Sequence, residues 1–262
     1  MLKAFSTAAT GMEAQQRMVD VTANNLANIN TNGFKRSTVD FQDLLYVKIR
    51  ASGTEVASGI TAPAGLEIGS GVRVASTVKV FSGGELQNTN RPLDVAVSGE
   101  GFLQVSLPNG DKRYTRDGSL QTNGEGQLVT TTGYTIEPSI SIPTDAVSVD
   151  IAKDGGVNVT DSAGTSSVVG NIELARFPNP PGLSSEGDNL FAETAASGTA
   201  TTGTPGDSGF GTLQSGFLEK SNVQMITELV NLIKAQRAYE TNSRAIRAAD
   251  EMLRKAIAIA RF

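Results

Sequence analysis

The sequence predicts an α+β protein in which terminal α-helices form a coiled coil, with an inserted mainly antiparallel β domain and extended arms. Apolar residues alternate at three- and four-residue steps near both ends of the chain, the pattern of a coiled-coil seam. Between the ends, short apolar runs alternate with Gly and Asn turn signals, which is typical of antiparallel strands. Since the helices flank the strands, we expect both termini to lie together.

The amino-terminal helix is predicted from residue 2 to about residue 29. It ends where Asn30 to Gly33 supply residues that tolerate the left-handed conformation of helix ends. Its seam consists of Leu2, Phe5, Ala9, Met12, Gln16, Val19, Ala23 and Leu26.

The carboxyl-terminal helix is predicted from Asn222 to near the end of the chain, with a length of about 58 Å. Its seam consists of Met225, Leu229, Leu232, Gln236, Tyr239, Ser243, Ile246, Asp250, Leu253, Ile257 and Ala260. A second stripe of small and apolar residues flanks the seam: Ala235, Ala238, Ala245, Ala249, Met252, Ala256 and Ile259. Such a helix can contact neighbours on more than one side.

The same periodicity also fits a closed helical hairpin, which periodicity alone favours because helices usually bury one stripe within their own domain. The polar seam positions Gln16, Gln236, Ser243 and Asp250 weaken that interpretation. They suit a partly hydrated interface between several chains better than a dry core.

Strands are predicted at 72–80, 94–97, 102–107, 127–131 and 147–151, separated by turn signals such as Asn123-Gly124. Residues 46–71 and 194–211 are rich in Gly, Ser, Thr, Ala and Pro, which indicates linkers or extended arms. We therefore predict three parts: a helical domain of 1–32 and 222–262, connecting arm and β segments of 33–90 and 205–221, and an outer β domain of 91–204.

Composition excludes several kinds of chemistry. The 262 residues contain no Cys and no His, so disulfides, thiol nucleophiles and imidazole-based catalysis or metal binding are impossible. A pair of carboxylates that hydrolyses glycosides is not excluded by the sequence, but no Trp is present to stack against a sugar ring. We expect no catalytic residues, no cofactor and no metal site.

Charge is distributed unevenly along the chain. The net charge is -5, with +2 in residues 1–50, +3 in residues 222–262 and -10 between them. No basic cluster interleaved with aromatic residues is present, which argues against nucleic-acid binding. No cleavable signal and no membrane-spanning run is evident, so we expect a protein that is not membrane-embedded.

Asn residues crowd the predicted end of the first helix, notably Asn24, Asn25 and Asn28. Asn is a poor helix former, so one interpretation is a fraying end with capping amides. The other is a set of amides that hydrogen-bond between subunits. The residues alone leave both open.

Eight segments resemble the flagellar rod and hook axial proteins. The amino-terminal signature is formed by Ala23-Asn24-Asn25-Leu26-Ala27-Asn28 and Thr31-Asn32-Gly33-Phe34-Lys35-Arg36. Residues 97–102 and 114–118 match in the middle, and residues 228–230, 236–240, 242–243 and 250–253 resemble the carboxyl-terminal signature. Residues 43–46, 49–50, 63–66, 68–69 and 71–73 are similar to the distal-rod members of that family.

The resemblance implies a subunit of the distal rod of the bacterial flagellar basal body, a rigid drive shaft that transmits torque from motor to hook. It implies export without a cleavable signal by the flagellar type III apparatus, and polymerisation into a helical tube. The implied partners are proximal rod and hook subunits at the ends and the L-ring and P-ring bushing proteins. The alternatives are another axial subunit, of hook or proximal rod, or a secreted β-rich binding module.

Within that assembly we expect the terminal helices to form the inner tube and residues 46–71 to act as an arm between adjacent subunits. The expected inter-subunit amides are Asn24, Asn25 and Asn28. The residues expected to pack at the assembly interface are Phe5, Met12, Val19, Leu229, Leu232, Tyr239, Ile246 and Leu253.

Overall fold

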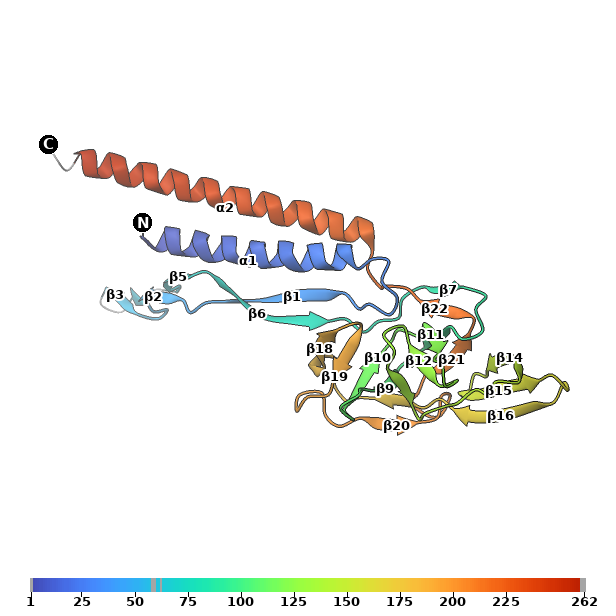
Figure 1. Cartoon of the computed structure of the whole chain (residues 1–262). Coiled ribbons are helices and arrows are strands. Elements are labelled where there is room, and N and C mark those ends of the chain that lie inside the picture. Colours follow the sequence, from blue (N-terminus) through green and yellow to red (C-terminus); the bar gives the residue numbers. More distant parts are fainter. Residues whose placement is uncertain (1, 58–59, 62, 260–262) are drawn as a thin grey trace. The chain divides into compact units, whose positions relative to one another are not determined.

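The structure, a computed structural model, describes residues 2–57, 60–61 and 63–259 (Figure 1). Helix α1 (Leu2–Ala27) opens the chain and helix α2 (Met225–Ile259) closes it, with β-strands between them. Every strand pair with a defined register is antiparallel. The predicted α+β class is confirmed.

The first strands are β1 (Ser37–Asp43), β2 (Val47–Arg50), β3 (Glu55–Ala57), β4 (Ile60–Thr61), β5 (Leu66–Ile68), β6 (Val72–Lys79) and β7 (Leu86–Asn88). Those that follow are β8 (Val95–Ser98), β9 (Phe102–Ser106), β10 (Lys112–Thr115), β11 (Leu120–Thr122), β12 (Leu128–Thr130), β13 (Thr135–Glu137), β14 (Ala146–Ile151), β15 (Gly156–Asp161) and β16 (Ser166–Asn171). The last are β17 (Leu174–Arg176), the 3₁₀ turn η1 (Pro180–Gly182), β18 (Ser184–Gly187), β19 (Leu190–Ala192), β20 (Thr201–Gly203), β21 (Thr212–Ser215) and β22 (Phe217–Glu219).

The chain divides into two compact units. The helix-arm unit comprises residues 1–26, 37–78 and 224–262, and the β unit comprises residues 27–36 and 79–223. The three-part division predicted from the sequence stays a prediction.

In the helix-arm unit, α1 and α2 lie side by side and antiparallel (Figure 1). Below them, β1 pairs with β6, and the segment predicted as an arm contains two small ribbons, β2 with β5 and β3 with β4. Side chains of β2 and β5 are exposed, as expected of a ribbon without a core of its own. No described helix has a stretch apolar enough to cross a membrane.

The β unit is built on a nine-stranded sheet with the order β11-β12-β13-β9-β10-β19-β18, to which β17 and β20 are added. A three-stranded sheet, β14-β15-β16, and the pairs β8-β21 and β7-β22 complete it. Its core is continuous and aliphatic, with fully buried residues such as Val95, Leu103, Leu128, Ile172 and Leu213. A second cluster stacks Phe102, Tyr114, Phe177 and Phe191 edge to face.

Candidate assembly surfaces

Two contacts define how α1 meets α2. The Asn25 amide nitrogen lies 3.4 Å from Glu228 Oε2. At the other contact, a Cβ on Gly11 would lie 2.8 Å from Asn242 Nδ2, so the absent side chain permits this approach. The two contacts are the same number of residues apart on both helices, which fixes one antiparallel register.

The face buried between the two helices consists of small and polar residues. The buried residues are Ala14, Thr22 and Asn25 on α1 and Glu228, Ala235 and Ala249 on α2. Glu228, Ala235, Asn242 and Ala249 follow one another at seven-residue steps, as coiled-coil core positions do. Small residues let two helix backbones approach closely.

This buried face is offset from the seam predicted from the sequence. Ala235 and Ala249 belong to the predicted second stripe, while the seam residues Leu229 and Tyr239 are 40% and 43% exposed. The seam residues Phe5, Met12, Val19, Leu232, Ile246 and Leu253 are half-buried. Their role between subunits stays a prediction.

Two of these residues meet along one side of the helix pair. Val19 and Tyr239 line a groove of about 390 Å³ together with Gln16, Gln236 and Glu240. Both polar seam glutamines therefore face the same groove as Val19 and Tyr239. An amphipathic groove of this kind fits a partly hydrated contact.

Asn25 acts within the chain. Its buried amide donates a hydrogen bond to the Ser37 carbonyl oxygen and accepts one from the Ser37 backbone N–H, both at 2.9 Å. It thereby holds the end of α1 on the first residue of β1. Asn24 is exposed, and Asn28 Oδ1 accepts a hydrogen bond from the Thr31 hydroxyl at 3.1 Å. A role between subunits for these three amides stays a prediction.

The first turns of α2 carry an exposed apolar patch. Ile226 is 79% exposed, and Val230 and Ile233, four and seven residues later, are also exposed. Residues at these spacings share one side of a helix. Patches of this kind mark protein–protein contacts more often than single exposed residues do.

The arm also presents apolar side chains. Leu45 is 90% exposed, and Tyr46, Ile49, Leu66 and Ile68 on or beside the β2-β5 ribbon are exposed as well. Leu45 and Tyr46 line a shallow hollow with Asp43, Leu44, Ser70 and Arg73.

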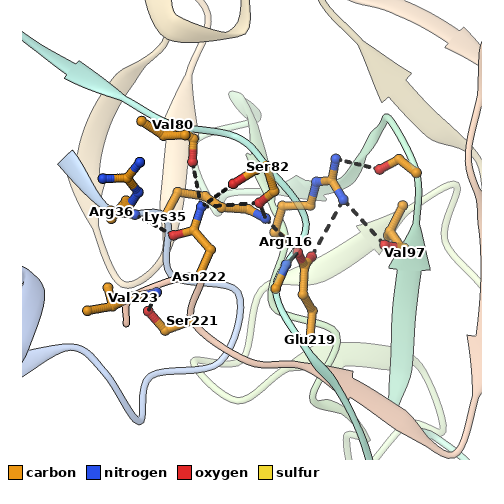
Figure 2. Close-up of polar contacts among 12 residues, drawn as sticks. Lys35, Arg36, Val80, Ser82, Val97, Arg116, Glu219, Ser221, Asn222 and Val223 are labelled. Atoms are coloured by element: carbon orange, nitrogen blue, oxygen red, sulfur yellow. Dashed lines mark hydrogen bonds and ion pairs between the residues drawn. The ribbon is translucent and has the colours of Figure 1, made fainter. Parts of the chain in front are cut away.

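A buried charge cluster lies in the β unit (Figure 2). Lys35 Nζ is 2.5 Å from Glu219 Oε1, and Arg116 Nη1 is 3.5 Å from Glu219 Oε2, with all three side chains almost fully buried. Lys35 also donates to the Ser82 carbonyl at 2.8 Å. Burial lowers the pKa of Lys35 and of Arg116, and the Glu219 carboxylate opposes the shift in both.

Backbone and amide contacts extend this cluster. Asn222 Oδ1 accepts from the Arg36 backbone N–H and its Nδ2 donates to the Val80 carbonyl, both at 2.8 Å (Figure 2). The Gly33 backbone N–H donates to the Glu219 carbonyl at 2.8 Å. The cluster thus joins four parts of the chain that lie far apart in sequence: residues 33–36, 80–84, Arg116 and residues 219–222.

Sequence analysis missed this cluster. Lys35 and Arg116 stand inside the two runs noted for their resemblance, but Glu219 and Asn222 stand in none. The sequence did show one sign of the cluster, a basic residue in each of these two runs. It did not show which acidic residue pairs with Lys35 or with Arg116. Only the fold brings Glu219 to both.

Comparison with known proteins defines the class of the chain. Residues 5–35 match the profile described as flagella basal body rod protein, residues 96–159 that of the flagellar hook protein FlgE/F/G D1 domain, and residues 214–259 that of the flagellar basal body rod FlgEFG protein C-terminal. These profiles place the chain in the class of flagellar rod and hook proteins.

Full-length relatives narrow the class. Flagellar basal-body rod proteins FlgG from Buchnera aphidicola (subsp. Schizaphis graminum) and from Caulobacter vibrioides are each 47% identical to the chain, over 97% and 96% of its length and 98% and 97% of theirs. FlgG from Bacillus subtilis is 38% identical over the whole of both chains. The chain therefore belongs to the FlgG family of flagellar basal-body rod proteins and is a structural subunit of the flagellar rod.

Proposed function

We propose that the chain polymerises through its terminal helices into the distal rod, a rigid shaft that transmits torque from the motor to the hook. The observation that carries this proposal is the helix-arm unit, which buries only small apolar residues while it exposes Ile226, Val230 and Ile233. Neighbouring copies would remove this apolar surface from water. Assembly would thus supply the stabilisation that the single chain lacks.

A subunit with different contact surfaces at its two ends forms an open helical polymer. Proximal rod and hook subunits would contact the ends of that polymer, and L-ring and P-ring proteins would surround it. Export through the flagellar type III apparatus without a cleavable signal fits a chain that has no Cys to form disulfides. The function is structural and needs no catalytic residue, metal or cofactor.

The proposal is tested in a strain from which the gene for this chain is deleted. We expect basal bodies that lack the distal rod in electron micrographs, and restored rods and swimming when the chain is supplied again. Full-length rods in the deletion strain would contradict the proposal. A labelled chain should also co-purify with intact basal bodies.

A further inference from the structure

The carboxyl-terminal end of α2 extends past the start of α1 (Figure 1). The register set by Gly11 with Asn242 and by Asn25 with Glu228 places the first residues of α1 opposite residues near 251. Every residue from 254 to 259 is exposed. We call residues 254–259 the α2 overhang.

The overhang carries the apolar seam beyond the helix that could cover it. Ile257 follows the half-buried Ile246 and Leu253 at seam spacing, so it lies on the same side of α2 as these two residues. Ile257 is nevertheless 56% exposed, and Ile259, on another side, is 76% exposed. Within the described part of the chain, nothing packs over either side chain closely enough to bury it.

The groove between Val19 and Tyr239 is the complementary feature. It lies in the middle of the helix pair, its volume of about 390 Å³ exceeds that of one isoleucine side chain, and it is lined by aliphatic and aromatic carbon. Glutamine amides edge it, so it can also satisfy polar groups of an entering helix.

Charge favours the same pairing. Glu240 lines the groove, and the overhang begins with Arg254 and Lys255. Arg254 pairs with Asp250 at 2.9 Å and Lys255 with Glu251 at 3.0 Å, both on the exposed helix surface. Exposed pairs of this kind contribute little, so these cations can turn to a new acidic partner at small cost.

We propose that the α2 overhang of one copy docks in the Val19–Tyr239 groove of a second copy, with Ile257 as its apolar anchor. The contact is heterologous, since overhang and groove are different surfaces present on every copy, and its repetition extends a polymer. This inference rests on the proposed function and identifies one of its contacts.

Engineered cysteines test the contact directly, because the chain has no native Cys. Rods are assembled from the double variant Gln16→Cys with Ile257→Cys and treated with a short thiol-specific cross-linker. Within one chain these positions are separated by about 30 Å along the helix pair, so a link within the chain is excluded. We expect a ladder of dimers and higher multimers on denaturing gels.

The matched control combines Ile257→Cys with Val168→Cys, since Val168 is an exposed residue of the β unit and should give no ladder. Rods that contain the first double variant but yield no ladder overturn the inference and leave the proposed function standing. If the unmodified chain is absent from rods, the proposed function falls and the inference with it.

A second variant pair covers the case in which the cysteines themselves disturb assembly. Ile257→Asp should lower incorporation into rods at least tenfold, because it removes the apolar anchor and places a carboxylate in the groove beside Glu240. Val168→Asp should incorporate normally. Equal incorporation of the two variants would overturn the inference.

Discussion

The two units of this chain bury and expose opposite kinds of residue. In the described part of the helix-arm unit, every buried apolar residue is an alanine, whereas the β unit buries Leu, Ile, Val and Phe in two clusters. Of the large apolar residues that are exposed, only Val147 and Val168 belong to the β unit. The β unit thus carries its own core, while the helix-arm unit leaves its larger apolar side chains half-buried or exposed.

This difference predicts that the β unit of a rod subunit is folded before assembly, while the helix-arm unit is not yet stably folded. Burial of a large apolar side chain contributes about 1.5 to 3 kcal/mol to the free energy of folding. The β unit gains this stabilisation many times over, whereas the buried alanines of the helix-arm unit cannot provide it. Folding of the helix-arm unit would then be coupled to association, as binding of neighbours stabilises only the ordered state.

The largest expected effect is a difference in amide hydrogen exchange within the purified monomer. Amides in 2–26 and 225–259 should exchange at least a thousandfold faster than those in the strands between 95 and 218, because the helices lack a core. Mass-resolved exchange checks this, together with limited proteolysis. Strong protection of both helices in a proven monomer would show a closed hairpin and remove the contrast between the units.

A charge at the predicted helix interface should block assembly without unfolding the β unit. Leu232→Asp should abolish incorporation into rods, because it places a carboxylate on a half-buried position of the predicted interface. The unfolding midpoint of the β unit should not change. Val147→Asp, which introduces the same charge at an exposed site of the β unit, is the control and should assemble normally.

Loss of one member of the buried charge cluster should destabilise the β unit alone. Lys35→Met leaves Glu219 without its nearest cation, and we expect the free energy of unfolding to fall by about 3 kcal/mol. Urea denaturation followed by circular dichroism measures this. Lys112→Met breaks a half-exposed pair with Glu137 and should cost less than about 1 kcal/mol. Equal effects would show that burial of the cluster contributes nothing.

The smallest expected effect concerns the helix-arm unit. Asn25→Ala removes both hydrogen bonds to Ser37, and should lower the local stability of the end of α1 in assembled rods by about 1 to 2 kcal/mol. Hydrogen exchange of rods measures it. Asp20→Ala, on the exposed side of the same helix, should change it by less than about 0.5 kcal/mol.

Much of the fold follows from local pattern. The helix predicted from Asn222 is α2, which begins at Met225, and the run predicted as a strand at 72–80 is β6, Val72–Lys79. The runs at 94–97, 102–107, 127–131 and 147–151 correspond to β8, β9, β12 and β14 within one or two residues. Such patterns depend only on residues close in sequence.

The choice of helix face did not follow from the pattern. Both stripes of α2 repeat at coiled-coil spacing, so periodicity cannot select between them. The structure buries the smaller stripe, with Ala235 and Ala249, because Gly11 and Ala14 on α1 allow close approach of the backbones. The larger residues of the other stripe remain available for contacts between copies.

The sequence by itself determined that helices stand at both ends, that turn-separated strands lie between them, and that no cysteine or histidine chemistry is possible. Tertiary structure alone decided which helix faces meet and that Lys35 and Arg116 share Glu219. The physical reason is range. Helix and strand periods arise from neighbouring residues, whereas helix contact and buried charge pairing depend on residues far apart in sequence, 203 positions for Asn25 with Glu228 and 184 for Lys35 with Glu219.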